Sequence, residues 1–284
     1  PAFKELAMAT TYIVRKNSRN DLRDRPGYKQ FSKPSRSGAG ASKRPGRDER
    51  RRAGERRPQQ RRGGGGNRQE MAVDLSKLIN KAVKGPAEAP YVPQTAFIDL
   101  PIDATLKENI VSKGYVTPTP IQDQSIPHVL KGEDVVGLAN TGTGKTAAFL
   151  IPLIDKVLKL RAAGTSERIL VMVPSRELAI QIEEEFWGFA KRLGINAVVC
   201  VGGASIEPQI RVLRRAPAFV IGTPGRLKDL MERRELDVST FGTVVLDEAD
   251  RMLDMGFIDD MRLILGKMSS KRHTLFFSAT MSRE

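Results

Sequence analysis

Short hydrophobic runs rich in β-branched residues recur along the chain from residue 135 onward, and each contains almost no charged residue. A strand that is buried on both faces has this composition, because neither of its faces meets water. The pattern therefore predicts six strands, at Val135–Ala139, Ile169–Val173, Val198–Val201, Phe219–Ile221, Val244–Leu246 and Leu275–Phe277.

Segments with a helical period separate these strands. Residues 178–193, for example, place Ile182, Phe186 and Phe189 on one face of a helix and three consecutive Glu residues on the other. Strands that alternate with helices predict an α/β fold, in which a parallel sheet carries crossover helices on both faces. Ligands bind such sheets beyond the carboxyl ends of the strands, so we expect the chemistry in the loops that follow them.

The first 70 residues have a different composition. They contain 20 Lys and Arg against 7 Asp and Glu, a net charge of +13, whereas residues 71–284 contain 27 against 26, a net charge of +1. Residues 32–68 offer too few apolar side chains to offset the entropy cost of ordering the chain. We therefore predict a disordered basic tail over residues 1–70, a linker over residues 71–96 that is helical in part, and a folded domain over residues 97–284.

The Arg/Gly-rich part of the tail, around Gly63–Gly66, suits two roles. Segments of this kind bind RNA through counterion release and guanidinium stacking. A solubilising spacer has the same composition, so the tail by itself leaves both roles open.

Composition excludes two classes of protein. A single Cys rules out a disulfide-stabilised scaffold, and no stretch approaches the roughly 18 consecutive apolar residues of a transmembrane helix. The first 14 residues lack the basic leader and apolar core of a secretory signal. We therefore expect a cytoplasmic protein that does not associate with membranes. Its first residue is Pro1, which suggests a trimmed or partial chain.

The loop after the first predicted strand has the pattern of a phosphate-binding loop between a strand and a helix. Its glycines let backbone amides turn toward phosphate oxygens, and the N-terminus of the following helix faces the same anion. Lys145 would reach the outer phosphates and Thr146 would bind magnesium. Position 139 holds Ala where the general pattern has Gly. The predicted phosphate-binding residues are Ala139, Asn140, Thr141, Gly142, Thr143, Gly144, Lys145 and Thr146.

Adjacent acidic residues follow the fifth predicted strand. Asp247 would hold magnesium, in part through water, and Glu248 would orient or deprotonate the attacking water, with Lys145 as the third catalytic residue. By itself, Asp-Glu-Ala-Asp at residues 247–250 also suits the start of a helix, where acids are favourable near the positive end of the macrodipole. The phosphate-binding loop upstream favours the first interpretation, a Walker B motif, in which an apolar strand ends in adjacent acidic residues.

These motifs, in this order, resemble those of the DEAD-box family of ATP-dependent RNA helicases, whose name is the tetrapeptide at residues 247–250. The resemblance extends from about Phe97 to Thr280 and implies a RecA-like P-loop NTPase domain. It also implies hydrolysis of ATP, with magnesium, coupled to the unwinding or remodelling of RNA. We expect the protein to be a monomer.

The segment from Gly114 to Gln122 resembles the Q motif of this family, with Phe97 as the family's isolated upstream aromatic residue. By this resemblance, Gln122 reads the edge of adenine and Phe97 stacks on its ring. An amide can read that edge because it both donates and accepts hydrogen bonds. Tyr115 and Thr117 complete the predicted ATP-binding residues. The pair at 119–120, Thr-Pro, suits a helix cap and first turn, which gives it a structural role.

The loops after the second, third and fourth predicted strands resemble the family's RNA-binding motifs. They offer free amides, hydroxyls and two arginines along one sheet edge, and by resemblance they grip the backbone of one RNA strand without reading its bases. The alternative is that Ser175 and Thr223 cap helices and that Arg176 forms a salt bridge. The predicted RNA-binding residues are Pro174, Arg176, Gly202, Gly203, Thr223, Pro224, Gly225 and Arg226.

Ser278-Ala-Thr280 follows the sixth predicted strand and resembles the family's motif III, whose hydroxyls contact the acidic loop. By this resemblance, Asp250, Ser278 and Thr280 couple hydrolysis to strand separation. The family also has a second RecA-like domain with an arginine that completes the ATP site, and the chain stops before it. Because such an arginine contributes about 10³–10⁵ in rate, we expect the chain to bind nucleotide but to hydrolyse it slowly.

Two other functions fit the same sequence. One is a nucleotide-gated RNA-binding or annealing module whose tail supplies the affinity; its RNA binding would then lose its strong salt dependence without residues 1–70. The other is a DNA helicase or translocase on the same fold. The Q motif and the Asp-Glu-Ala-Asp loop favour RNA over DNA.

Overall fold

The computed structural model describes residues 12–14 and 91–280. The predicted tail and linker therefore lie outside the described residues except at positions 12–14 and 91–96. Within the described part, no helix is long and apolar enough to cross a membrane.

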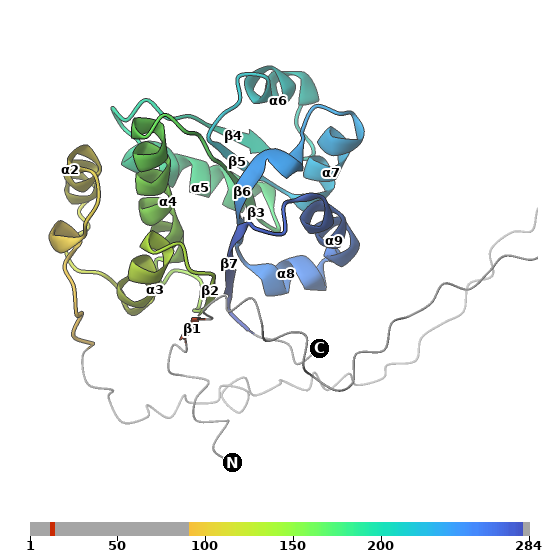
Figure 1. The fold of residues 1–284 in the computed structure, drawn as a ribbon. Helices are drawn as coiled ribbons and strands as arrows, with labels where there is room; N and C mark the ends of the chain where they lie inside the picture. Colours follow the sequence, from red (N-terminus) through yellow and green to blue (C-terminus); the bar gives the residue numbers. More distant parts are fainter. Residues whose placement is uncertain (1–11, 15–90, 281–284) are drawn as a thin grey trace, which may run out of the picture. The chain divides into compact units, whose positions relative to one another are not determined.

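The described chain alternates between strands and helices, as the hydrophobic pattern predicted (Figure 1). In chain order, its elements are β1 (Tyr12–Val14), η2 (Phe97–Asp99, a short 3-10 helix), α2 (Ala104–Ser112), α3 (Pro120–Leu130), β2 (Val135–Leu138), α4 (Lys145–Ala162), β3 (Arg168–Met172), α5 (Arg176–Phe189), β4 (Ala197–Cys200), α6 (Ile206–Leu213), β5 (Phe219–Gly222), α7 (Pro224–Glu232), η3 (Val238–Thr240), β6 (Phe241–Leu246), α8 (Ala249–Asp254), α9 (Ile258–Lys267) and β7 (His273–Ser278).

The six predicted strands are confirmed, and they form the parallel part of one sheet in the spatial order β2-β7-β6-β3-β5-β4. Strand β3 lies in the middle of this part, where Leu170 is opposite both Val244 of β6 and Val220 of β5. Strand β1 adds an antiparallel strand beside β2, with Tyr12 opposite Gly137. The hydrophobic pattern did not predict β1, which falls within the segment expected to be a disordered tail.

Alternation of side chains along the strands divides the core between the two faces of the sheet. On one face, Ile169 and Val171 belong to a buried cluster with residues of α3, α4 and α5. On the other face, Leu170 and Met172 belong to a cluster with residues of α6, α7, α8 and α9. Figure 1 shows these two groups of helices on opposite sides of the sheet. Burial of both faces explains why the strands lack a polar side.

All six parallel strands end at the same edge of the sheet, so the order of the strands fixes the order of the loops along it. The phosphate-binding loop follows β2, motif III follows β7, and the acidic loop follows β6. The three loops with predicted RNA-binding residues follow β3, β5 and β4. The fold thus places the loops with predicted nucleotide-binding residues along one half of this edge and the loops with predicted RNA-binding residues along the other half, which we call the RNA half.

Candidate functional site

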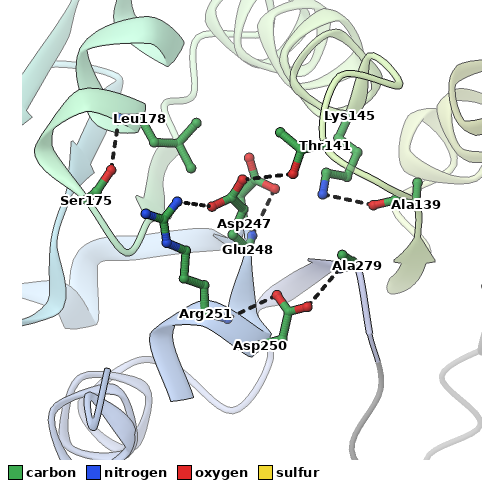
Figure 2. A network of polar contacts seen from close by, with 10 residues as sticks. All are labelled: Ala139, Thr141, Lys145, Ser175, Leu178, Asp247, Glu248, Asp250, Arg251 and Ala279. Carbon is green, nitrogen blue, oxygen red and sulfur yellow. Dashed lines mark hydrogen bonds and ion pairs between the residues drawn. The ribbon is translucent and has the colours of Figure 1, made fainter. Parts of the chain in front are cut away.

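The phosphate-binding loop adopts a turn that requires glycine at two positions. Gly142 and Gly144 have φ angles of +84° and +90°, in the left-handed region where a side chain is strained. Lys145 begins α4, and its Nζ donates a hydrogen bond to the carbonyl oxygen of Ala139 across 2.9 Å (Figure 2). The side chain of Lys145 is therefore folded back onto its own loop, and its residue is 6% exposed.

The N-terminus of α3 contacts this loop through two polar side chains. Nε2 of Gln122 donates to the carbonyl oxygen of Gly144 across 3.0 Å, while its Oε1 accepts from the amide of Thr119 across 2.9 Å. Thr119 caps α3 and Pro120 occupies its first turn, so their predicted structural role is confirmed. The hydroxyl of Thr119 also donates to the carbonyl oxygen of Thr143 across 2.8 Å, a contact that the sequence did not reveal.

The aromatic residues of the predicted adenine site pack against one another. The ring of Phe97 meets that of Tyr115 edge to face, with 5.7 Å between centroids, and Tyr115 meets Phe189 at 5.4 Å. Phe97 is 2% exposed, so its ring would have to be uncovered before a base could stack on it. Thr117 is exposed nearby in the chain. The adenine contacts of Phe97, Tyr115, Thr117 and Gln122 remain predictions.

The first residue of the acidic loop is a carboxylate without access to water. Asp247 is 2% exposed, and burial raises its pKa to about 6 although the positive charge of Lys145 opposes the shift. The hydroxyl of Thr146, at the start of α4, makes no hydrogen bond to any described residue. A buried carboxylate and a hydroxyl are oxygen donors of the kind that a hard divalent cation prefers, so these two residues suit magnesium.

The second acidic residue is held between two elements. Glu248 has a φ of +52°, which is unusual for a residue with a side chain. Its Oε1 accepts a hydrogen bond from the hydroxyl of Thr141, in the phosphate-binding loop, and its Oε2 pairs with Nη1 of Arg251, each across 3.3 Å (Figure 2). One carboxylate therefore links the acidic loop to the phosphate-binding loop, and Arg251 is a contact that the sequence motifs did not indicate.

The third acidic residue is bonded to the end of β7. Oδ2 of Asp250 accepts hydrogen bonds from the amide and hydroxyl of Thr280, at 2.8 and 2.9 Å, and from the amide of Ala279 at 3.2 Å. The hydroxyl of Ser278 accepts from the amide of Asp250 across 3.4 Å. Burial opposes ionisation, but these hydrogen bonds hold the pKa of Asp250 below its usual value. The structure thus brings the predicted coupling residues together.

The RNA half of the edge contains two arginines in different surroundings. Arg176, the first residue of α5, is exposed and has no carboxylate partner among the described residues. It lies near the Gly202–Gly203 loop, because a Cβ added to Gly203 would be 3.8 Å from its Nη1. Arg226 instead donates to Oε1 of Gln209 at 3.0 Å and to the carbonyl oxygen of Ala204 at 3.1 Å, and its side chain is 11% exposed.

The other predicted RNA-binding residues lie at the same strand ends. Ser175 accepts a hydrogen bond from the amide of Leu178, as a helix cap does (Figure 2). Thr223 occupies the cap position of α7, where no side-chain cap bond forms. Pro174 and Pro224 are buried, whereas Gly202 and Gly225 are exposed. The structure brings all these residues to one edge, and their contact with RNA remains a prediction.

Comparison with known proteins places these features in a family. The family model that matches is described as DEAD/DEAH box helicase and covers residues 119–284, more than half of the chain. The chain is 46% identical over 190 residues to a protein named ATP-dependent RNA helicase DeaD from Klebsiella pneumoniae. It is 45% identical over 185 residues to one named DEAD-box ATP-dependent RNA helicase CshA from Streptococcus pneumoniae. These matches cover 66% and 65% of this chain but 29% and 35% of the relatives, so the chain spans about a third of the length of the curated relatives it matches.

Solved structures agree with this result. A DEAD box protein from Methanococcus jannaschii is 37% identical, with a TM-score of 0.62 over 68% of this chain and 52% of that one. A hypothetical ATP-dependent RNA helicase from Sulfolobus tokodaii is 35% identical, with a TM-score of 0.59 over 64% of this chain and 52% of that one. The fold predicted from the sequence, an α/β domain of the RecA-like P-loop type, is confirmed.

Proposed function

We propose that this chain, which belongs to the DEAD/DEAH box helicase family, is the ATP-binding part of an ATP-dependent RNA helicase. The observation that carries the proposal is the hydrogen bond between Thr141 and Glu248, which joins the phosphate-binding loop to the acidic loop across 3.3 Å. A carboxylate beside the phosphate-binding loop can act on a water that attacks the outermost phosphate.

ATP would bind with its phosphates on the loop of residues 139–146 and its base near α3. The ammonium group of Lys145 would leave the carbonyl oxygen of Ala139 and bind the outer phosphates. Nε2 of Gln122 already donates a hydrogen bond to the phosphate-binding loop, so a base that binds to Gln122 would affect a residue in contact with this loop. Recognition of adenine by this amide would distinguish ATP from GTP, because guanine presents the opposite donors and acceptors.

Magnesium would be held by the Thr146 hydroxyl and the Asp247 carboxylate, with water and phosphate oxygens as the remaining ligands. When bound, it would neutralise negative charge on the phosphates. Glu248 would orient the attacking water and accept its proton, which requires the carboxylate to exchange its contacts with Thr141 and Arg251 for the water. A movement of the acidic loop would also move the residues that follow β7, because Oδ2 of Asp250 accepts hydrogen bonds from both the amide and the hydroxyl of Thr280.

RNA would bind as a single strand along the loops after β3, β5 and β4. Arg176 offers an exposed guanidinium beside the amides of the Gly202–Gly203 loop, and this combination suits phosphate oxygens. These loops would contact the RNA backbone and not its bases, so affinity would depend on salt and little on sequence. A cytoplasmic location, a monomeric state and a contribution of the basic tail to affinity remain parts of the proposal.

The proposal is tested by measuring nucleotide and RNA binding to the same protein. We expect the chain to bind MgATP more tightly than MgGTP by calorimetry. We also expect a non-hydrolysable ATP analogue to raise its affinity for single-stranded RNA. RNA should stimulate the turnover of ATP, however slow it is, and Glu248→Gln should abolish the turnover without weakening nucleotide binding. Glu184→Gln, a change to an exposed glutamate on α5, is the matched control and should leave every value unchanged.

Two outcomes would contradict parts of the proposal. Equal affinity for ATP and GTP would show that the base is not recognised near α3. Nucleotide-dependent RNA binding without any turnover that depends on Glu248 would instead favour a switchable RNA-binding module.

A further inference from the structure

A carboxylate next to Gln122 holds the segment that leads to Phe97. Asp123 is on the first turn of α3 and is 7% exposed. Its Oδ2 accepts hydrogen bonds from the hydroxyl of Tyr91 at 2.6 Å and from the amide of Gln94 at 2.8 Å. Its Oδ1 accepts from the hydroxyl of Thr95 at 2.5 Å and from the amide of the same residue at 3.1 Å. Four donors of the segment 91–95 therefore converge on one side chain.

This segment, which we call the upstream strap (residues 91–95), has few apolar anchors of its own. Val92 is 80% exposed and Tyr91 is 42% exposed, so hydrophobic burial contributes little to its position. Two residues after the strap, Phe97 enters the core and meets Tyr115. Because the strap is short, the place where Asp123 holds it limits where the ring of Phe97 can lie.

The other side of the same helix turn contacts the phosphate-binding loop. Gln122 is adjacent to Asp123 in the chain and donates to the carbonyl oxygen of Gly144. Thr119, at the cap of α3, donates to the carbonyl oxygen of Thr143. One turn of α3 thus binds the nucleotide loop with one set of side chains and the upstream strap with another.

We infer that Asp123 is a positioning residue for recognition of the nucleotide base, because it holds the upstream strap against the helix turn that carries Gln122 and thereby limits where the ring of Phe97 can lie. The inference rests on the proposed function, in which the base lies near Gln122. The residue does not touch the nucleotide. It acts through the strap, which closes the base site beside α3, and a strap that moved would leave the phosphate-binding loop in place.

The chemistry of the four hydrogen bonds makes a sharp test possible. Each oxygen of Asp123 accepts one backbone amide, from Gln94 or from Thr95. An asparagine has nearly the same shape, but in either orientation its NH₂ group would face a backbone N–H that can only donate. Asp123→Asn therefore disrupts the hydrogen bonds to the strap with almost no change of volume, and it leaves a buried amide without an acceptor.

The experiment compares a ligand that has a base with one that has only phosphates. Dissociation constants are measured by calorimetry for MgATP, MgGTP and magnesium tripolyphosphate, with wild type and Asp123→Asn. We expect the variant to bind MgATP about fivefold or more weakly, as for a coupling of ordinary size, and to lose most of its preference for ATP over GTP. Its affinity for tripolyphosphate should stay within about twofold of wild type, because that ligand contacts the loop alone.

Two further variants separate this role from a general loss of stability. Asp155→Asn alters another buried aspartate, one that accepts the amide of Asp103 across 2.8 Å and no donor of the strap, and it should leave the ratio of ATP to GTP affinity unchanged. Thr95→Val removes one of the four donors to Asp123 and should lower the ratio of ATP to GTP affinity by less than Asp123→Asn does. It also provides the comparison if Asp123→Asn does not fold.

The inference is overturned if wild type prefers ATP to GTP and both Asp123→Asn and Thr95→Val keep that preference. It is also overturned if Asp123→Asn weakens ATP and tripolyphosphate equally, since the effect would then act on the whole site. If wild type itself does not prefer ATP to GTP, the proposed base site fails and the inference fails with it; this result is distinct because it needs no variant.

Discussion

The ammonium group of Lys145 lies 2.9 Å from the carbonyl oxygen of Ala139. The first residue of the phosphate-binding loop thus accepts a hydrogen bond from the same ammonium group that would bind the phosphates. The same charge opposes the rise in the pKa of Asp247 that burial causes. Lys145 thus stabilises two groups before any ligand arrives. Binding of phosphate would exchange a neutral carbonyl partner for an anion, which adds the attraction between two opposite charges to the hydrogen bond.

Replacement of this lysine should weaken the response to nucleotide. For Lys145→Ala we expect MgATP to bind about tenfold to a hundredfold more weakly, which corresponds to the loss of about 1.5–3 kcal/mol from hydrogen bonds to a charged group. The rise in melting temperature at a fixed concentration of MgATP should be smaller accordingly. Lys159→Ala changes an exposed lysine of the same helix, α4, and should leave both measurements unchanged. A full MgATP response in Lys145→Ala would show that this loop does not bind the phosphates.

The burial of Asp247 predicts a specific dependence of stability on pH when magnesium and nucleotide are absent. Its pKa is about 6 in the folded protein against an ordinary value of 3.8 for an aspartate. Between these two values the folded state binds more protons than the unfolded state, so stability falls as pH rises through this window. The contribution is about 3 kcal/mol when the group is fully ionised at pH 7. Asp247→Asn should therefore gain stability relative to wild type as pH rises from 4 to 7, as measured by urea unfolding in a chelator.

Asp250→Asn is the matched variant with the opposite sign. Hydrogen bonds from Thr280 hold the pKa of Asp250 below its usual value, so this carboxylate stabilises the fold above its unfolded pKa and ceases to do so as pH falls. The deficit of Asp250→Asn relative to wild type should be largest at pH 7 and should shrink toward pH 3. Parallel pH curves for the two variants would contradict the assignment of their environments.

Hydrophobic pattern was sufficient to predict the strands but not where every strand begins. The strand predicted at Val244–Leu246 starts at Phe241, and the one predicted at Leu275–Phe277 starts at His273. Each of these added starts contains a polar residue, Thr243 or His273, that is buried with a partner distant in the chain. The hydroxyl of Thr243 accepts from Nζ of Lys156 across 2.9 Å, and Nε2 of His273 lies 2.7 Å from the carbonyl oxygen of Glu133. A local pattern cannot reveal such partners.

The same limit applies to the site. The residues that follow strands could be assigned from their motifs, because the edge of a parallel sheet is a known place for ligands. Gln209 and Asp123 were not predicted, since each lies inside a helix and its role depends on a loop that folds back from elsewhere. A buried amide or carboxylate in the first or second turn of a helix is a signal for such residues, but burial is visible in the structure and not in the sequence.

Close packing at the end of β5 predicts a strong effect from a single methyl group. A Cβ added to Gly222 would lie 2.6 Å from the backbone carbonyl oxygen of Cys200 and 2.9 Å from the side chain of Leu227. Because a backbone atom cannot move aside cheaply, we expect Gly222→Ala to lower the free energy of unfolding by about 1–3 kcal/mol. Gly266→Ala is the control: a Cβ there meets nothing within 4 Å, and alanine in a helix should raise stability by up to about 1 kcal/mol. Urea unfolding measures both.

The two arginines of the RNA half should respond differently to replacement. Arg176 is exposed, so Arg176→Ala should weaken binding of single-stranded RNA and reduce the slope of log affinity against log salt by about 0.7, with little effect on stability. Arg226→Ala should weaken RNA binding and also lower the free energy of unfolding by about 1–3 kcal/mol, because the buried Oε1 of Gln209 loses its donor.

Gln209→Ala separates the position of Arg226 from its charge. Gln209 also donates to the carbonyl oxygens of Val201 and Ser205, so it joins the loop after β4 to the arginine after β5. In Gln209→Ala the guanidinium keeps its charge but loses its fixed geometry, and we expect weaker RNA binding with an unchanged salt slope. Fluorescence anisotropy with a labelled single strand at several salt concentrations measures both quantities. An RNA affinity equal to that of wild type would mean that Arg226 acts through charge alone, and the loops after β4 and β5 would then bind RNA independently.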